Sequence, residues 1–221
     1  MIFKLNRIGF LYNSVIRTQI RRAAKLGSTQ LKNRMSTCTA LDDNKLDIVW
    51  MDLEMTGLDI NTDQILELSC IITDKHLNIK SEGPSFAIRH PQHVYDNMNE
   101  WCMKHHYESG LVDRCKESNV TPELVENIVL SYLKENIPQG QCPLAGNSIY
   151  MDRLFINKFY PAVDKYLLYR IIDVSTTKEL ATRWYPDVSK ATPRKMLAHR
   201  SLSDIKESIA ELKYYKEHLF K

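Results

Sequence analysis

Two carboxylates directly after a short apolar run are the clearest sign of chemistry in the sequence. Ile48, Val49 and Trp50 form a run that favours a buried β-strand, and Asp52 and Glu54 follow it with one residue between them. Because side chains alternate faces along a strand, both acids point the same way. Like charges held together oppose each other's ionisation, and a divalent cation between them removes the conflict. Oxygen ligands of this kind suit Mg²⁺ or Mn²⁺.

Three more residues of suitable type lie at the predicted ends of other elements. Asp152 stands at the start of a predicted helix, Asp204 lies in the first turn of the last helix, and His199 precedes it by five residues. Five residues on an ideal helix would separate two side chains widely in azimuth, so we expect His199 on the preceding loop, folded back toward Asp204. Acids at helix N-termini and a histidine at the surface each have ordinary explanations. Taken together with Asp52 and Glu54, they predict one shared site.

The composition is that of an ordinary globular protein. With 221 residues, 43% of them hydrophobic, the chain is long enough for one domain with a sizeable core. No apolar run approaches the roughly 20 residues that span a bilayer, so we expect no membrane insertion. The five cysteines are odd in number and never form C-x-x-C, which argues against a disulfide framework and a zinc ribbon.

The charge is divided unevenly along the chain. Residues 1–41 contain eight lysines and arginines and no acid. Removing these eight cations from the net charge of +3 leaves about −5 for residues 42–221. The body is therefore mildly acidic and lacks the broad basic surface that long nucleic acids usually require.

The acid-free leader is typical of a mitochondrial transit peptide. Apolar residues recur at helical spacing beside scattered arginines: Ile8, Leu11, Tyr12, Val15 and Ile16. We therefore expect residues 1–41 to be a disordered or helical presequence that directs the chain to the mitochondrial matrix. A disordered basic tail that binds nucleic acid is the alternative. Met35 lies just before the body, and a start there would give a cytoplasmic or nuclear form.

Residues 46–221 are predicted to form a single domain. Its strands are expected over residues 46–52, 64–74 and 77–89 as an antiparallel meander, and over residues 142–145 and 170–174. Helical segments are expected within residues 94–118 and over 121–137 and 151–160, from residue 175, and over 201–220. Strands first, followed by alternating helices and strands, predict a mixed α/β layer architecture.

Five segments of this body carry motifs of a known enzyme family. They are WMDLEMTGL (50–58), CPLAGNSIYMDR (142–153), YRIIDVSTTKEL (169–180), RWYP (183–186) and HRSLSDIKESI (199–209). With D-x-E, a middle Asp and H-x-x-x-x-D, the chain resembles the oligoribonuclease (small fragment nuclease) family of DEDDh 3′→5′ exonucleases. The resemblance covers nearly all of residues 46–221 and implies a ribonuclease H-like fold, a central mixed β-sheet flanked by helices. Ser203 departs from it, because the family often has an acid there that is not a ligand.

The resemblance implies a two-metal hydrolase. Asp52, Glu54 and Asp204 would bind two divalent ions, Mg²⁺ or Mn²⁺, with Asp152 ligating directly or through waters. Four carboxylates carry −4 and two ions +4, so the loaded site is near neutral and accepts a phosphodiester. His199 would be the general base that takes a proton from the attacking water. The implied reaction is RNA degradation from the 3′ end of very short oligoribonucleotides, down to dinucleotides, to nucleoside 5′-monophosphates.

The resemblance also implies substrate-binding residues. Leu58 is similar to a leucine that wedges against one base, and Trp101 to an aromatic platform for the other. Five positions match residues that cap the 5′ end of a very short substrate: Ser148, Tyr169, Arg170, Ser175 and Thr177. In the family this tyrosine and arginine act across a homodimer interface, so a homodimer is implied. Core aromatic packing is the other interpretation of Trp101 and Tyr169.

Two other functions remain open at this point. Within the enzymes, the chain would be an exonuclease on longer RNA or on DNA, like the ribonuclease T-like relatives. Outside them, it would be a non-catalytic RNA-binding version of the fold. Such a protein is expected to have lost at least one of the five site residues, and all five are present here.

Overall fold

The computed structural model describes residues 44–193 and 200–220. The predicted transit peptide, the alternative start at Met35 and the predicted base His199 lie outside the described residues. The domain boundaries predicted from the sequence therefore stay a prediction.

Three antiparallel strands open the described chain. They are β1 (Ile48–Met55), β2 (Ile65–Thr73) and β3 (Ile79–Ala87), and β2 pairs with both others. The predicted meander is confirmed, but the predicted end of the first strand at residue 52 is wrong. β1 continues to Met55 because β2 stays paired with it beyond Asp52. In β3 the register shifts around Gly83 and Pro84, where proline has no N–H for the ladder.

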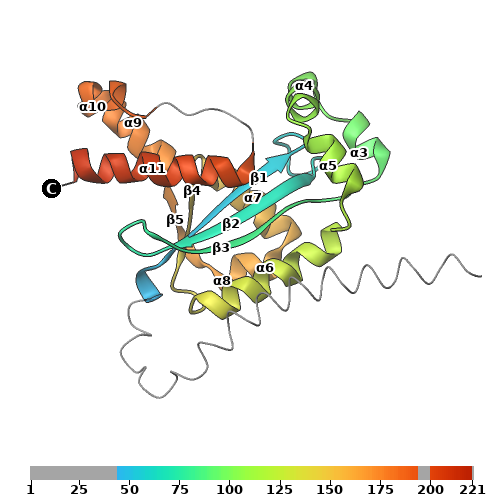
Figure 1. The fold of residues 1–221 in the computed structure, drawn as a ribbon, viewed down its shortest axis with the longest axis horizontal. Coiled ribbons are helices and arrows are strands. Elements are labelled where there is room, and N and C mark those ends of the chain that lie inside the picture. Colours follow the sequence, from blue (N-terminus) through green and yellow to red (C-terminus); the bar gives the residue numbers. More distant parts are fainter. Residues whose placement is uncertain (1–43, 194–199, 221) are drawn as a thin grey trace, which may run out of the picture. The chain divides into compact units, whose positions relative to one another are not determined.

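Two parallel strands complete the sheet. β4 (Pro143–Gly146) pairs with β1, and β5 (Leu168–Asp173) pairs with β4, which gives the order β3-β2-β1-β4-β5. β1 is therefore the central strand, and β5 lies at one edge (Figure 1). The predicted central mixed sheet is confirmed.

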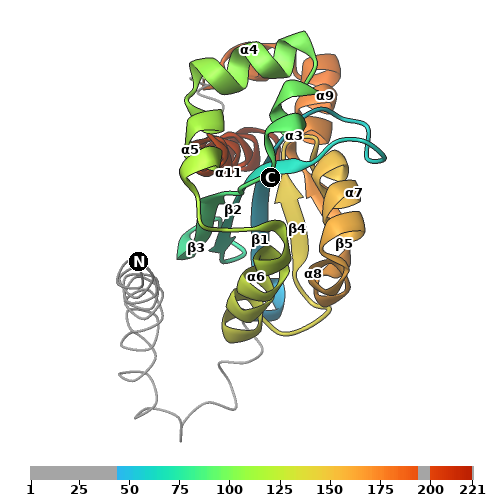
Figure 2. The same ribbon diagram turned by 90° about the vertical axis from the view of Figure 1, so that its right-hand side faces the viewer.

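Helices cover both faces of this sheet (Figures 1 and 2). One face packs on α6 (Pro122–Asn136), α7 (Ile149–Phe159) and α8 (Pro161–Tyr166). The other packs on α9 (Val174–Trp184) and α11 (Ser201–Leu219). The apolar stripe predicted for the last helix is confirmed, since its isoleucines and leucines at residues 205, 209, 212 and 219 all pack in the second cluster.

Two short α-helices in the described chain were not predicted. They are α8 and α10 (Pro186–Lys190), and each begins at a proline. In the sequence, Pro161 indicates the end of the preceding helix, but a proline is equally suited to the first position of a new one. The same residue type therefore ends α7 and begins α8.

Short helices gather beyond the ends of the antiparallel strands. They are α3 (Gln92–Asp96), α4 (Glu100–Glu108) and α5 (Leu111–Glu117), which fit the helical pieces predicted over residues 94–118. Tyr95 and Leu111 pack there with Leu66 of β2 in a third apolar cluster. Among the described residues, no helix combines the length and the apolar character needed to cross a membrane.

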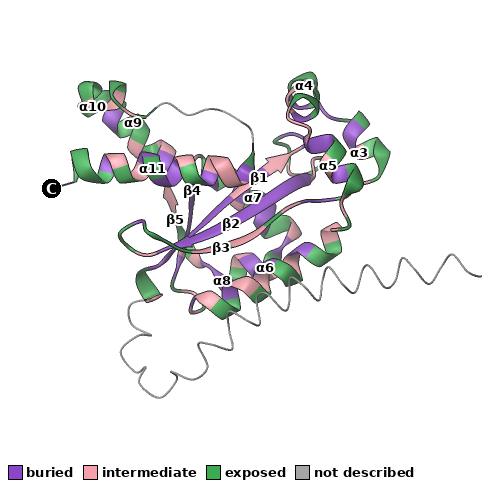
Figure 3. Ribbon diagram, viewed as in Figure 1, coloured by how far each residue is buried: buried purple, intermediate pink, exposed green. Residues whose placement is uncertain are grey.

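The two faces of β1 lead into different cores. Val49, Met51 and Leu53 belong to the cluster shared with α6 and α7, whereas Ile48 and Trp50 belong to the cluster shared with α11. Burying side chains of this size stabilises a fold by about 1.5–3 kcal/mol each. Figure 3 shows β2 beside it buried along its whole length. Residues 52 and 54 continue the alternation of Ile48 and Trp50, so they lie on the α11 side.

Candidate active site

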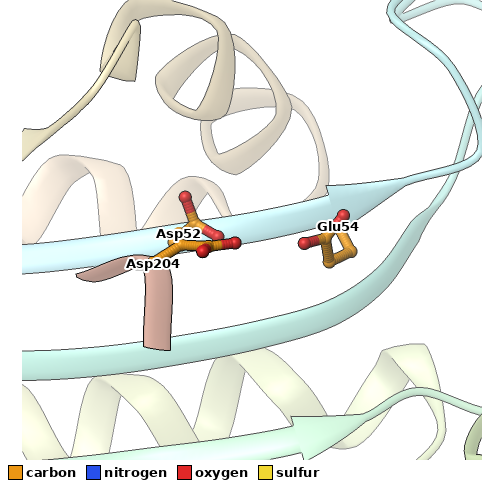
Figure 4. Close-up of side chains that lie close together, drawn as sticks. All are labelled: Asp52, Glu54 and Asp204. Carbon is orange, nitrogen blue, oxygen red and sulfur yellow. The ribbon is translucent and has the colours of Figure 1, made fainter. Parts of the chain in front are cut away.

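Three carboxylates meet where β1 faces the start of α11. Asp52 and Glu54 come from β1 and Asp204 comes from α11, and one oxygen of each lies within 4.8 Å of the others. Figure 4 shows the three side chains turned toward one another between the strand and the helix. The strand fixes two of these positions by alternation, and the helix brings the third from the far end of the chain.

Hydrogen bonds hold the first turn of α11 against the sheet. The backbone N–H of Arg200 donates to Oδ2 of Asp204 at 3.1 Å. The hydroxyl oxygens of Ser201 and Ser69 lie 2.6 Å apart and are buried, which ties the helix start to β2. At the other side, the Asn147 amide donates to Ser208 Oγ at 2.6 Å. Contacts to β2 and to the residue after β4 therefore set the position of Asp204.

Asp152 adds a fourth carboxylate from α7. It lies in the first turn of that helix, it is buried, and its Oδ1 accepts a hydrogen bond from the backbone N–H of Leu53 at 2.9 Å. Leu53 is the residue between Asp52 and Glu54. Asp152 is thus anchored to the same stretch of β1, although it is outside the group of three oxygens. This position suits a ligand that acts directly or through water.

Burial and mutual repulsion make these acids hard to ionise without a cation. Burial raises the pKa of Asp52 well above its usual range, and Asp152 and Glu54 raise it further. Burial, followed by Asp204 and Glu67, raises the pKa of Glu54 from 4.5 to about 8. Burial raises the pKa of Asp152 to about 7, although the hydrogen bond from the Leu53 N–H acts in the opposite direction and lowers it. A divalent cation supplies the missing positive charge, so the donor set fits a hard metal ion.

A fifth carboxylate, Glu67, was missed by the sequence reasoning. It stands directly opposite Glu54 in the β1–β2 register, it is only 3% exposed, and it pairs with Arg114 of α5 at 2.8 Å. The signal was present in the sequence, because Glu67 is the one charged residue of the run ILELSCIIT. An acid inside a fully buried strand needs a partner or a function.

His106 was also missed. It is buried in α4, its Nε2 lies 2.8 Å from the carbonyl oxygen of Met55, and its Nδ1 lies 4.0 Å from Oε2 of Glu54. The histidine attaches α4 to the last residue of β1. The sequence does not indicate this contact, because His105 and His106 are adjacent. Only the fold shows that His106, and not His105, reaches Met55.

The two residues predicted to contact bases are exposed. Leu58 is 65% exposed on the loop after β1, and Trp101 is 56% exposed on α4 with its ring stacked on His105 at 4.1 Å. A Cβ at Gly57 would lie 2.4 Å from Oδ2 of Asp63, so glycine is required here by a close approach. The same Asp63 accepts hydrogen bonds from Thr56 and the Asp59 backbone and thereby orders the loop that carries Leu58.

The predicted capping residues divide into two groups. The Ser148 N–H donates to Ser175 Oγ at 2.9 Å and to Asp173 Oδ1 at 3.0 Å, at the carboxyl ends of β4 and β5. Ser148 adopts a positive φ of 51° there. Such strand ends are the usual place for a ligand in parallel sheets. Thr177 lies partly buried in the following helix, α9.

Tyr169 and Arg170 form the second group, on the edge strand β5. Tyr169 is 73% exposed, and the Arg170 guanidinium lies 5.0 Å from its ring centroid. Core packing, the other interpretation of Trp101 and Tyr169, is wrong, because both side chains are mainly exposed. The roles assigned to all these residues from the resemblance stay predictions.

Known proteins share both the sequence and the fold. A family model described as an exonuclease (RNase T) matches residues 49–212. A probable oligoribonuclease of Drosophila melanogaster is 60% identical over the full length of both chains. A mitochondrial oligoribonuclease of Homo sapiens is 51% identical over 174 residues, which cover 79% of this chain and 73% of that one.

A solved structure adds support for the fold alone. Escherichia coli Exonuclease I, solved with a 5cy-dA13 oligonucleotide, has a TM-score of 0.59 at 14% identity. The match covers 77% of this chain and 40% of that chain, and it confirms the predicted ribonuclease H-like exonuclease fold. By sequence, the chain belongs to the oligoribonuclease family, and the enzyme class predicted for it, a 3′→5′ exoribonuclease, is confirmed.

Proposed function

We propose that this exoribonuclease hydrolyses very short oligoribonucleotides, down to dinucleotides, and releases nucleoside 5′-monophosphates from the 3′ end. The observation that carries the proposal is the convergence of Asp52, Glu54 and Asp204 within 4.8 Å on a chain of the oligoribonuclease family. The roles proposed for the other residues depend on these three carboxylates.

The acidic cluster and the exonuclease family together indicate that the site binds divalent metal. We propose two ions, Mg²⁺ or Mn²⁺, held by Asp52, Glu54 and Asp204, with Asp152 ligating directly or through water. When bound, two such ions polarise the attacking water and stabilise the leaving 3′ oxygen. The carboxylates fix the position of that chemistry on the central strand, and the apolar residues beneath them hold the strand rigid.

The proton from the attacking water is proposed to pass to His199. A neutral imidazole takes up a proton near physiological pH, which suits this role. Support comes from the sequence around the site: His199 directly precedes Arg200, whose N–H is bonded to Asp204. Histidine and metal ligand are thus supplied by one short segment.

A preference for short substrates follows from the few side chains that are available to bind RNA. Leu58 and Trp101 offer exposed apolar surface for two bases, and base stacking is worth about 1–3 kcal/mol per base for any sequence. Ser148 and Ser175, joined at the ends of β4 and β5, are proposed to close the 5′ side with Arg170. The mildly acidic body provides few further contacts for a long phosphate backbone.

We further propose a mitochondrial homodimer. Tyr169 and Arg170 are exposed on the edge strand β5, where a partner subunit can reach them. Residues 1–41 are proposed as the presequence, in keeping with mitochondrial relatives such as the human one. A reporter fused after residue 41 should enter mitochondria, and one whose leader begins at Met35 should remain outside. A reporter that stays cytosolic with the full leader favours the basic-tail interpretation instead.

The test of the substrate is a length series. Single-turnover cleavage of 5′-labelled RNA from two to about twenty nucleotides is measured at two salt concentrations. We expect the highest efficiency at about two to five nucleotides and a shallow salt dependence, since one or two phosphate contacts give a slope near −1. Efficiency that is flat or rises with length, with a steep salt slope, would overturn the proposal and favour an exonuclease on longer RNA or DNA.

A further inference from the structure

Glu67 and Arg114 form an ion pair on the same face of the sheet as the predicted metal ligands. Residues directly opposite in an antiparallel pair share a face, with Cβ atoms about 4.5–5.5 Å apart. Glu67 is opposite Glu54 in this register, so its side chain rises beside that of Glu54. Its negative charge acts on both acids of β1, raising the pKa of Asp52 as well as that of Glu54.

Glu67 is buried, Arg114 is about one third exposed (32%), and the pair is incompletely bonded. Oε1 of Glu67 accepts from Nη1 of Arg114 at 2.8 Å, whereas Oε2 is buried with no hydrogen-bond partner among the described residues. Nε and Nη2 of Arg114 are also buried and have no partner in that part of the chain. Leaving one buried polar group unsatisfied costs about 1–3 kcal/mol, and more for a charged one. Stability alone therefore does not account for this pair.

A neighbouring pair shows what a purely superficial ion pair looks like here. Glu82 of β3 bonds Lys206 of α11 at 2.9 Å, and both side chains are nearly half exposed. Their remaining polar atoms are open to solvent, and such pairs contribute little to stability. Glu67, by contrast, is 3% exposed and lies across from a predicted ligand.

We propose that Glu67 is a hydrogen-bond acceptor of the metal centre, and that Arg114 positions it. Its Oε2 accepts a hydrogen bond from a water molecule on a metal ion held at Glu54, and the Arg114 contact through Oε1 fixes the carboxylate for this purpose. Partners of this kind, one step removed from the metal, orient ligands and tune affinity. The inference rests on the metal binding proposed above.

Charge balance supports the assignment of both residues. Glu67 alone would take the site from −4 to −5, beyond what two divalent ions neutralise. Arg114 cancels that addition, so the site gains an acceptor without gaining net charge. The polar hydrogens left on Arg114 remain available to the same water structure.

The test measures Mn²⁺ binding to the purified full chain by calorimetry, together with the melting temperature with and without Mn²⁺. Glu67→Gln keeps the shape of the side chain and an oxygen for Arg114, but it loses one acceptor. We expect Mn²⁺ to bind roughly 10–100-fold more weakly, the range seen for such partners. Arg114→Met should weaken binding in the same direction, and Arg114→Lys should restore part of it. Glu82→Gln, the matched control, should bind like the wild type.

A merely structural role predicts a different pattern. It would lower the metal-free melting temperature of Glu67→Gln and leave its Mn²⁺ affinity unchanged, and that result overturns the inference. If Glu67→Gln does not fold, the neutral double variant Glu67→Gln/Arg114→Met is measured in its place, with the same weakened affinity expected.

Asp52→Asn separates this inference from the proposed function. A wild type that binds no Mn²⁺, or binds it as well with Asp52→Asn, contradicts the metal site itself. A wild type that loses Mn²⁺ with Asp52→Asn but not with Glu67→Gln contradicts only the role of Glu67.

Discussion

Asp52, Glu54 and Asp204 stand on the central strand and the final helix, whereas Leu58 and Trp101 stand on a loop and a short helix at the surface. The acids are partly buried, and burial together with the charge of Asp204 raises the pKa of Asp52 and Glu54, so they are held together at a cost to the metal-free fold. Leu58 and Trp101 are mainly exposed and support little of the core. The proposed metal ligands thus lie in the rigid centre, and the residues proposed to contact bases lie outside it. Substitutions in the two regions should therefore differ in kind.

The largest effect is expected from removing a metal ligand. Asp52→Asn or Asp204→Asn should abolish turnover, because each removes a charge needed to hold the ions. The metal-free melting temperature should stay the same or rise, since a buried repulsion disappears, and added Mg²⁺ should stabilise the variant less than the wild type. Turnover assays and thermal melts check both. Asp113→Asn, an exposed acid on α5, is the control. Near-normal turnover in either ligand variant contradicts the assignment.

Removing the proposed base should have the next largest effect. His199→Ala should slow the chemical step by roughly 10²–10⁴-fold and leave substrate affinity nearly unchanged. The wild-type rate should rise with pH through the histidine range, and this rise should vanish in the variant. Single-turnover rates between pH 5.5 and about 8.5 measure it. A variant that retains the wild-type profile shows that another group accepts the proton.

The outer region should respond through binding and not through stability. Trp101→Ala should weaken dinucleotide binding by about 5–150-fold, corresponding to the 1–3 kcal/mol of one stacked base. The melting temperature should hardly change, because the ring is mainly exposed. Tyr107→Ala is a matched control, an exposed aromatic on the same helix. If Trp101→Ala unfolds the protein while Tyr107→Ala does not, the tryptophan is structural.

A further effect concerns stability against pH in the metal-free protein. The folded pKa of Glu54, about 8, lies above its ordinary value of 4.5, so the folded state binds this proton more tightly than the unfolded state. Its contribution is complete below pH 4.5 and is lost as the pH rises through about 8. The free energy of unfolding, measured with urea and EDTA from pH 5 to 9, should decline by on the order of a few kcal/mol.

Two variations sharpen that measurement. Saturating Mg²⁺ should restore stability at the alkaline end, because the cation replaces the proton. Glu54→Gln should reduce the pH dependence and leave the part that is due to Asp52 and Asp152, whereas Glu82→Gln on the surface should leave it as it is. A wild-type curve with no decline would mean that burial and the neighbouring carboxylates do not raise the pKa of Glu54 in the folded state.

Local rules were sufficient for the elements that carry the acids. Strand alternation predicts that Asp52 and Glu54 share a face, and the apolar stripe of residues 201–220 predicts that this helix packs on the sheet. The shared site with Asp204 was predicted from the common position of these residues at the ends of elements and from the family resemblance, because no local pattern reports a contact between β1 and α11. The missed residues Glu67 and His106 and the missed end of β1 depend on such distant contacts.

Glu67 illustrates the limit most clearly. Its apolar neighbours predict a buried strand, but its partner Arg114 lies on another element and is brought to it by the fold. His106 is likewise defined by its contact with Met55 and not by its neighbours in α4. β1 extends to Met55 because it stays paired with β2, and the residues of β1 alone do not predict that pairing. His199 remains a prediction from sequence, outside the described residues.

Because β1 pairs with β4 and its acids meet α11, the enzyme can become active only late in its own synthesis. β1 pairs with β4 at Val49 and Leu144, and its acids meet Asp204 from the final helix. At roughly 5–20 residues per second, a ribosome needs about 8–30 s to proceed from Asp52 to Asp204. Through that interval the nascent chain, made beside messenger RNA, lacks the third of its proposed metal ligands. We expect hydrolytic activity to begin only after α11 has left the ribosome and docked.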